Sequence, residues 1–329
     1  MEKQHPFQNA LDTATAASYT LTDLFEINYQ RREWQKGDKE KLGRPDSRQV
    51  SLYKSIITSS IAALEEFIEG LIFTSFLEIN RLQDNNFTST EMLEDFLRGR
   101  LSRDMQNPSS SNIGNLSKKY LGINITEFWE GELFSSQINY KVVGRKKGED
   151  KVELASQSYL KKRCDNKDIN LILNKFILVR NSFAHQDSSI SVFKPDEIKR
   201  FRKILEEKSI DEESKEKIGV IACALSFFLK ESPGRHDDPL LSWTVHERHC
   251  INSLYLYFNI VTSLTSGIIG YLEENFKANY SSFQPLVFSI EDGAWSKYLP
   301  KIPIYKDSNI SVNLIDYAPN SRLRGVGGS

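Results

Sequence analysis

The apolar pattern of residues 47–83 constrains the fold of this chain more than any other segment does. Apolar side chains recur there at the spacing of one helix face, at Leu52, Ile56, Ala63, Phe67, Leu71 and Leu77. Asp46 or Ser47 stands at the start, where a side-chain oxygen accepts a hydrogen bond from the first helical turn. The pattern predicts one long helix with an apolar stripe, placed at the centre of a helical bundle.

The rest of the chain predicts further helices and a few short strands. Helical spacing covers residues 7–36, 89–105, 126–134, 152–163, 168–185, 195–207, 214–231 and 247–276. Residues 285–290, 302–305 and 310–315 predict short strands, and the prolines near them favour sheet edges. We therefore expect an all-α protein with three parts: an N-terminal helix and loop packing on the bundle (1–46), the bundle (47–208), and a helical extension with short terminal strands (209–329).

The predicted helix over 168–185 is apolar enough to be buried, and it ends in residues suited to phosphate chemistry. Asp168 is a candidate cap, and three polar side chains mark one exposed flank, namely Asn170, Asn174 and Lys175. The segment closes with Arg180-Asn181-Ser182-Phe183-Ala184-His185. Arginine carries a permanent planar charge that binds phosphate oxygens, and histidine exchanges a proton near neutral pH. This pairing indicates a phosphate-directed site at the end of the helix.

The spacing within this motif also predicts an oligomeric state. Asn181 and His185 are four residues apart and share one helix face, so the amide can orient the imidazole. Arg180 and His185 lie roughly 140° apart around a helix. Their head groups therefore converge only through the reach of arginine or across a two-fold interface, which favours a homodimer.

Two segments together resemble the HEPN superfamily, and most closely its RiboL-PSP/MAE-type branch. One is the Arg-Asn-x-x-x-His motif at the end of a buried helix, and the other is the Ala-Leu-Glu-aromatic pattern that begins at Ala63. The resemblance covers roughly residues 48–205 and implies a helical bundle. It departs from the toxin branch that is paired with a nucleotidyltransferase antitoxin, because Asp187 stands where that branch has a tyrosine.

This resemblance implies a function and a set of site residues. Arg180 and His185 would be the catalytic pair, Asn181 a positioning residue and Glu65 the acidic partner. Many members are metal-independent endoribonucleases, which implies RNA cleavage that leaves 2′,3′-cyclic phosphate and 5′-hydroxyl ends. The role implied is a toxin or antiviral defence effector that acts on RNA, with transfer RNA among the candidates. The implied partners are a second copy that completes the active site, and an antitoxin or sensor protein.

Local basic clusters predict where the RNA backbone would be bound, because the net charge of −1 is not basic overall. Two clusters precede the motif and could line a groove for phosphates. They consist of Arg145, Lys146 and Lys147, and of Lys161, Lys162 and Arg163.

Other interpretations of the motif stay open. Arg180 and His185 would also suit the carboxyl end of a helix, where cationic side chains are favoured. A HEPN-like protein that binds RNA or acts as an adaptor without cleavage, and a helical protein-interaction module, are the alternative functions.

Several site classes lack support in the sequence. The histidine-rich stretch holds His236, His246, Glu247, His249 and Cys250, but its spacing fits neither His-Glu-x-x-His nor a paired Cys-x-x-Cys site. We therefore expect no metal and no cofactor. Three widely spaced cysteines favour a reducing compartment, so a cytoplasmic location is expected. No apolar stretch has the length of a signal peptide or a membrane span.

Overall fold

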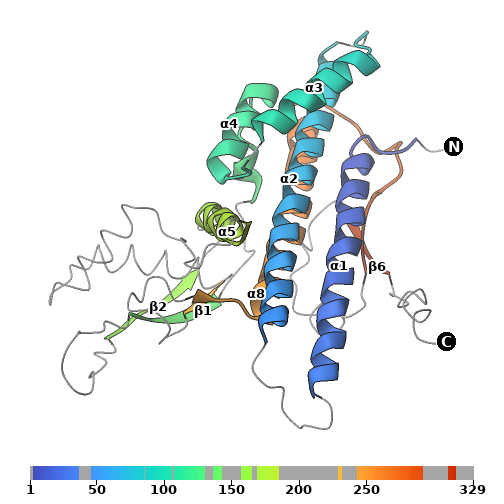
Figure 1. Cartoon of the computed structure of the whole chain (residues 1–329). Helices are drawn as coiled ribbons and strands as arrows, with labels where there is room; N and C mark the ends of the chain where they lie inside the picture. Colours follow the sequence, from blue (N-terminus) through green and yellow to red (C-terminus); the bar gives the residue numbers. More distant parts are fainter. Residues whose placement is uncertain are drawn as a thin grey trace, which may run out of the picture.

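Three long helices form the frame of the protein (Figure 1). The computed structural model describes residues 3–36, 46–84, 86–105, 107–129, 136–142, 157–164, 169–184, 229–231, 243–291 and 310–315. Helix α1 (Gln8–Lys36) lies beside α2 (Ser47–Gln83), and α8 (Glu247–Phe276) packs against α2. Their bounds confirm the helices predicted over 7–36, 47–83 and 247–276, and they confirm the helical fold class.

The start of α2 shows why these bounds could be predicted. The Asp46 carboxylate accepts a hydrogen bond from the Gln49 backbone N–H at 2.7 Å, which satisfies one of the free donors of the first turn. Arg31, near the end of α1, donates to the same carboxylate at 2.6 Å. Asp46 therefore caps α2 and also ties it to α1.

Shorter helices pack on α2 and α8. They are α3 (Glu91–Asp104), α4 (Ser110–Leu121), the 3₁₀ helix η1 (Ile125–Trp129) and α5 (Ile169–Ala184). Thr90 caps α3 and Ser109 caps α4 through their hydroxyls, and Gly122 ends α4 with a φ of 76°, which favours glycine. Helix α4 was not predicted, because the serines and asparagines at its start are typical of loops.

A strand pair corrects one predicted helix. Strands β1 (Ser136–Val142) and β2 (Gln157–Cys164) pair in antiparallel fashion, so most of the helix predicted over 152–163 is wrong. Backbone pairing with a neighbouring strand has overridden a weak helical pattern there. A second short pair joins β3 (Lys230–Glu231) to β4 (Trp243–Thr244), and β3 replaces the last residues of the helix predicted over 214–231. The rest of that segment, and the predicted 195–207 and 302–305 elements, lie outside the described residues.

The C-terminal strands lie against the first helix. Strands β5 (Leu286–Glu291) and β6 (Ile310–Ile315) pair in parallel and confirm two predicted strands. The Gln8 side chain donates to the Val287 carbonyl at 2.9 Å and accepts from the Val287 N–H at 3.1 Å. Two turns further along α1, the Thr15 hydroxyl accepts a hydrogen bond from the Ser289 N–H at 3.3 Å. The Ser18 hydroxyl donates to the Ser289 carbonyl at 3.2 Å. Side chains of α1 thus take the place of a neighbouring strand.

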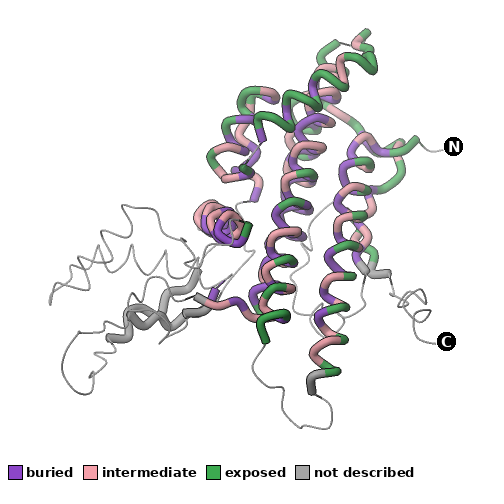
Figure 2. Tube along the Cα trace, in the orientation of Figure 1, coloured by how far each residue is buried: buried purple, intermediate pink, exposed green. Residues whose placement is uncertain are grey.

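The core follows the apolar stripes of the long helices. Figure 2 shows buried positions recurring along α1, α2 and α5. Lys175 on α5 is only 1% exposed, which corrects its prediction as part of an exposed flank. The predicted flank is instead engaged in packing, because Asn170 accepts a hydrogen bond from the Trp129 indole and Asn174 accepts one from the Ser110 backbone. These contacts fix η1 and α4 against α5.

Candidate functional site

Helix α5 presents Arg180 to the side of α2. The apolar face of α5 is buried at Ile172, Phe176 and Val179, and this burial fixes the rotation of the helix. Arg180 then lies beside Glu65, with its Nη2 atom 3.7 Å from the Glu65 Oε2 atom. Their side chains are 22% and 24% exposed, so the pair lies at the border between the core and solvent.

The Arg180 guanidinium has hydrogen-bonding capacity left over. Its Nε and Nη2 atoms are buried, yet neither has a hydrogen-bond partner among the described residues. The separation from Glu65 exceeds hydrogen-bond distance, so the carboxylate attracts the guanidinium without using its donors. Buried donors without acceptors are costly, and they are expected where a ligand supplies the acceptor. The arrangement suits the binding of an anion.

A second carboxyl group lies one turn further along α2. Glu69 is four residues after Glu65 and therefore faces the same way. Partial burial, with the nearby charges of Glu65 and Glu66, raises the pKa of Glu69 to about 7. Burial also raises the pKa of Glu65, and the charge of Arg180 opposes this rise. Glu69 was not predicted as a site residue, although its spacing from Glu65 was a usable signal.

Lys54 was also not predicted as a site residue. The Lys54 Nζ atom lies 5.1 Å from the centroid of the Phe183 ring. Phe183 follows Arg180 by three residues on α5. Lys54 precedes Glu65 by eleven residues, which brings it back to nearly the same face of α2 after three turns. This spacing was the only sequence signal for Lys54, and it has meaning only once α5 is known to lie across that face.

The remaining predicted residues are placed as follows. Asn181 follows Arg180 on α5 and is partly exposed. His185 lies outside the described residues, and so do Arg145, Lys146 and Lys147. The residues Lys161, Lys162 and Arg163 lie on β2, opposite Asn139, Ile138 and Gln137 of β1. The structure therefore brings Glu65 and Arg180 together, while the roles of all the predicted residues stay predictions.

The histidines of the 246–250 stretch begin a helix. His246 is the N-cap residue of α8, and the Nδ1 atom of His249 accepts a hydrogen bond from the His246 backbone N–H at 2.9 Å. His249 and Cys250 are buried in the bundle. Over the part of the chain that the structure describes, no three side chains of the metal-binding types form a cluster. His236 lies outside that part.

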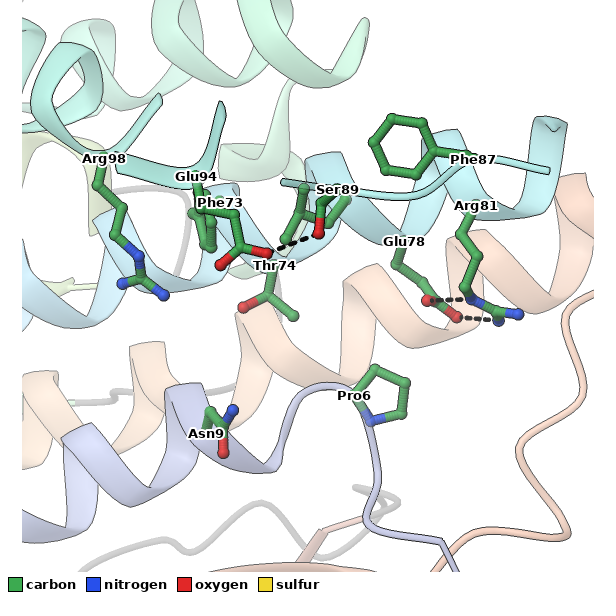
Figure 3. A pocket seen from close by; sticks show the side chains of 11 residues that line it. Pro6, Asn9, Phe73, Thr74, Glu78, Arg81, Phe87, Ser89, Glu94 and Arg98 are labelled. Atoms are coloured by element: carbon green, nitrogen blue, oxygen red, sulfur yellow. Dashed lines mark hydrogen bonds and ion pairs between the residues drawn. The ribbon is translucent and has the colours of Figure 1, made fainter. Parts of the chain in front are cut away.

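A pocket of about 320 Å³ opens further along α2, between that helix, the start of α1 and α3 (Figure 3). The Arg98 guanidinium lies 4.1 Å from the Phe73 ring centroid at one end of it. At the other end Glu78 accepts two hydrogen bonds from Arg81, at 2.8 and 2.7 Å. The pocket contains none of the predicted site residues, and its lining holds Glu78 and Glu94 as well as the two arginines.

None of the described helices combines the length and the apolar character needed to span a bilayer.

Comparison with protein families places the chain beside a known family. The model of the family described as RiboL-PSP-HEPN matches residues 26–212, which is more than half of the chain. The matched range contains α2, α5, the Glu65–Arg180 pair and the Arg-Asn-x-x-x-His motif. Comparison with curated proteins and with solved structures gives no significant match.

Proposed function

Because the chain belongs to the RiboL-PSP-HEPN family, we propose that it is a metal-independent endoribonuclease whose site is built around Arg180. The family suggests a ribonuclease-like or RNA-related function. The observation that carries the proposal is the Arg180 guanidinium, whose buried donors have no acceptor within the described part of the chain and which lies beside Glu65 at 3.7 Å. A phosphate of the RNA would supply the missing acceptors.

The proposed reaction uses the 2′-hydroxyl of the substrate as its nucleophile. A base removes the proton from the 2′-oxygen, which attacks the adjacent phosphorus and forms a five-coordinate phosphorane. The bond from phosphorus to the 5′-oxygen then breaks, and an acid protonates that oxygen. The products are a 2′,3′-cyclic phosphate and a 5′-hydroxyl. DNA lacks the nucleophile and would not be cut.

The proposed roles follow from the chemistry of each side chain. His185 acts as the base or the acid, because imidazole exchanges protons near neutral pH. Arg180 stabilises the negative charge that grows on the phosphorane oxygens, and this requires that it be oriented before the substrate arrives. Glu65 orients Arg180 through the ion pair. Asn181 orients the imidazole from one turn away.

The wider assembly is part of the proposal. A homodimer would bring Arg180 of one copy and His185 of the other together, and the family suggests RNA interaction and dimers. The basic residues at 145–147 and 161–163 would contact the RNA backbone. A toxin or antiviral effector in the cytoplasm, controlled by an antitoxin or sensor protein, is the proposed biological role. Residues 209–329 would serve for partner binding or control.

The decisive experiment incubates the wild-type protein, His185→Ala and Arg180→Ala with total cellular RNA in EDTA and maps the new ends. Cleavage by wild type alone, with cyclic-phosphate and 5′-hydroxyl ends, is the expected result. A folded wild-type protein that binds RNA without cutting it would instead support a binding or adaptor role. Cleavage that needs added divalent metal, or that leaves 5′-phosphate ends, would overturn the proposed mechanism.

A further inference from the structure

One turn of α5 carries the cation Arg180 and is contacted by a second cation, Lys54 of α2. Glu65 attracts Arg180, and Phe183 lies under the ammonium group of Lys54. Arg180 and Phe183 are three residues apart and are therefore neighbours on the surface of α5. Lys54 and Glu65 are about 16 Å apart along the axis of α2, yet Lys54 contacts a ring that lies only one turn of α5 from Arg180.

Within the described ranges, Lys54 lies over an aromatic ring rather than beside a carboxylate. A cation over an aromatic face is attracted by the ring quadrupole, and the ring carries no opposite charge. Among the described residues, the Lys54 ammonium has no carboxylate within ion-pair distance. Lys119 shows the contrasting case, since its ammonium lies 2.6 Å from the Asp104 carboxylate. Lys54 is also only partly buried, so a ligand can reach it.

We infer that Lys54 is a second phosphate-binding residue of the Arg180 site, and that it contacts an RNA phosphate next to the one held by Arg180. The inference rests on the proposed ribonuclease function. It names a binding residue rather than a catalytic residue, because Lys54 would act on a phosphate that is not cut. Its role would be to fix the register of the RNA strand on α5.

Salt dependence can test this role separately from cleavage. Each phosphate that a protein contacts on a single strand adds about 0.7 to the slope of log K against log salt concentration. A lysine that contacts a phosphate contributes to this slope, whereas a lysine that only packs on the helix surface does not. The Lys54→Gln variant removes the charge and keeps a side chain of similar length.

The experiment measures binding of a single-stranded oligoribonucleotide at several salt concentrations, in the His185→Ala background so that the RNA stays intact. Lys54→Gln should bind several-fold more weakly at low salt, with the slope smaller by about 0.7. Lys54→Arg should keep the slope, since it keeps the charge. Lys118→Gln is the matched control, because it removes the same charge from an exposed position on α4. Thermal unfolding of each variant checks that the fold is intact.

The failures of the two proposals can be told apart. A slope and an affinity that Lys54→Gln leaves unchanged, or changes only as much as Lys118→Gln does, would overturn the role of Lys54 and leave the ribonuclease proposal standing. A wild-type protein that neither binds nor cuts RNA would overturn both. A wild-type protein that cuts RNA, with Lys54→Gln changing only the unfolding temperature, would show that Lys54 is structural.

Discussion

The Glu65 carboxylate lies 3.7 Å from the Arg180 guanidinium, which is close enough for attraction and too far for a hydrogen bond. Glu65 can therefore orient Arg180 while leaving its donors free for a phosphate. Removing the charge of Glu65 would free the guanidinium to adopt other orientations, and it would also remove a negative charge from beside the proposed RNA-binding site.

We expect Glu65→Gln to lower the rate of RNA cleavage about tenfold, or about 1.4 kcal/mol in the activation barrier. RNA binding should be unchanged or slightly tighter, so the loss should appear in kcat rather than in Kd. Single-turnover kinetics and a binding titration would separate the two. Glu66→Gln is the matched control, because Glu66 is an exposed neighbour on the same turn. An equal loss in both variants would contradict an orienting role for Glu65.

The raised pKa of Glu69 predicts a pH dependence of stability. Its pKa is about 7 in the folded protein against an ordinary value of 4.5, so between these values the folded state holds a proton that the unfolded chain releases. The contribution of Glu69 to the free energy of unfolding is therefore fully present below about pH 4.5 and is lost as the pH rises through about 7.

The Glu69→Gln variant does not lose stability in this way as the pH rises, since glutamine does not titrate. We expect the variant to be more stable than the wild type at pH 8 by about 1 kcal/mol, after allowance for solvent screening of a half-exposed group. The two proteins should differ little near pH 4.5. Urea unfolding of the wild type and of Glu69→Gln at both pH values would measure this. A constant difference across the pH range would show that Glu69 titrates normally.

The contact between α8 and η1 predicts opposite effects for two glycines on one helix. A Cβ atom at Gly267 would lie 2.4 Å from the Phe128 side chain, whereas a Cβ atom at Gly270 would meet nothing within 4 Å. Gly267→Ala should destabilise the protein by about 1–3 kcal/mol through overpacking. Gly270→Ala should stabilise it by up to about 1 kcal/mol, because alanine favours the helix. Thermal unfolding would give both values.

A second substitution tests the cause of the Gly267 effect. The double variant Gly267→Ala/Phe128→Ala should lose less stability than the sum of its single variants, because the clash has gone. Strict additivity would mean that the two side chains do not meet.

Burial predicts that one cysteine is unreactive. Cys250 is fully buried at the start of α8, where its thiol lies 3.6 Å from the Tyr53 carbonyl oxygen, and burial raises its pKa well above the ordinary value. Since the thiolate is the reactive form, iodoacetamide at pH 8 should leave Cys250 unmodified in the folded protein. Mass spectrometry of peptides from native and urea-unfolded samples would show this. Fast labelling of the native protein would mean that the start of α8 opens readily.

The long helices could be predicted because their evidence is repeated many times along the chain. Over 47–83 every turn of the pattern repeats the same apolar face, and the Asp46 cap marks the start. The elements missed had weaker or misleading local signals. Helix α4 begins among serines, and β2 depends on pairing with β1, which no local pattern reveals.

The candidate site could be predicted only in part, for a related reason. The motif and the Ala-Leu-Glu-aromatic pattern singled out Arg180 and Glu65, and the structure places these two side by side. Lys54 and Glu69 depend on how α5 crosses α2, and the crossing is set by packing rather than by either helix alone. The burial of Lys175 was missed because a single charged residue in an apolar helix is usually exposed.

The hydrogen bonds from α1 to β5 have a consequence for association. An open strand edge is a template on which another chain can form a sheet. Strand β5 has no such edge at Val287 and Ser289, because β6 pairs on one side while Gln8, Thr15 and Ser18 occupy the backbone groups on the other. The first helix of the protein therefore shields a strand near the end of its chain, and a chain shortened past α1 would expose a surface that recruits further copies into aggregates.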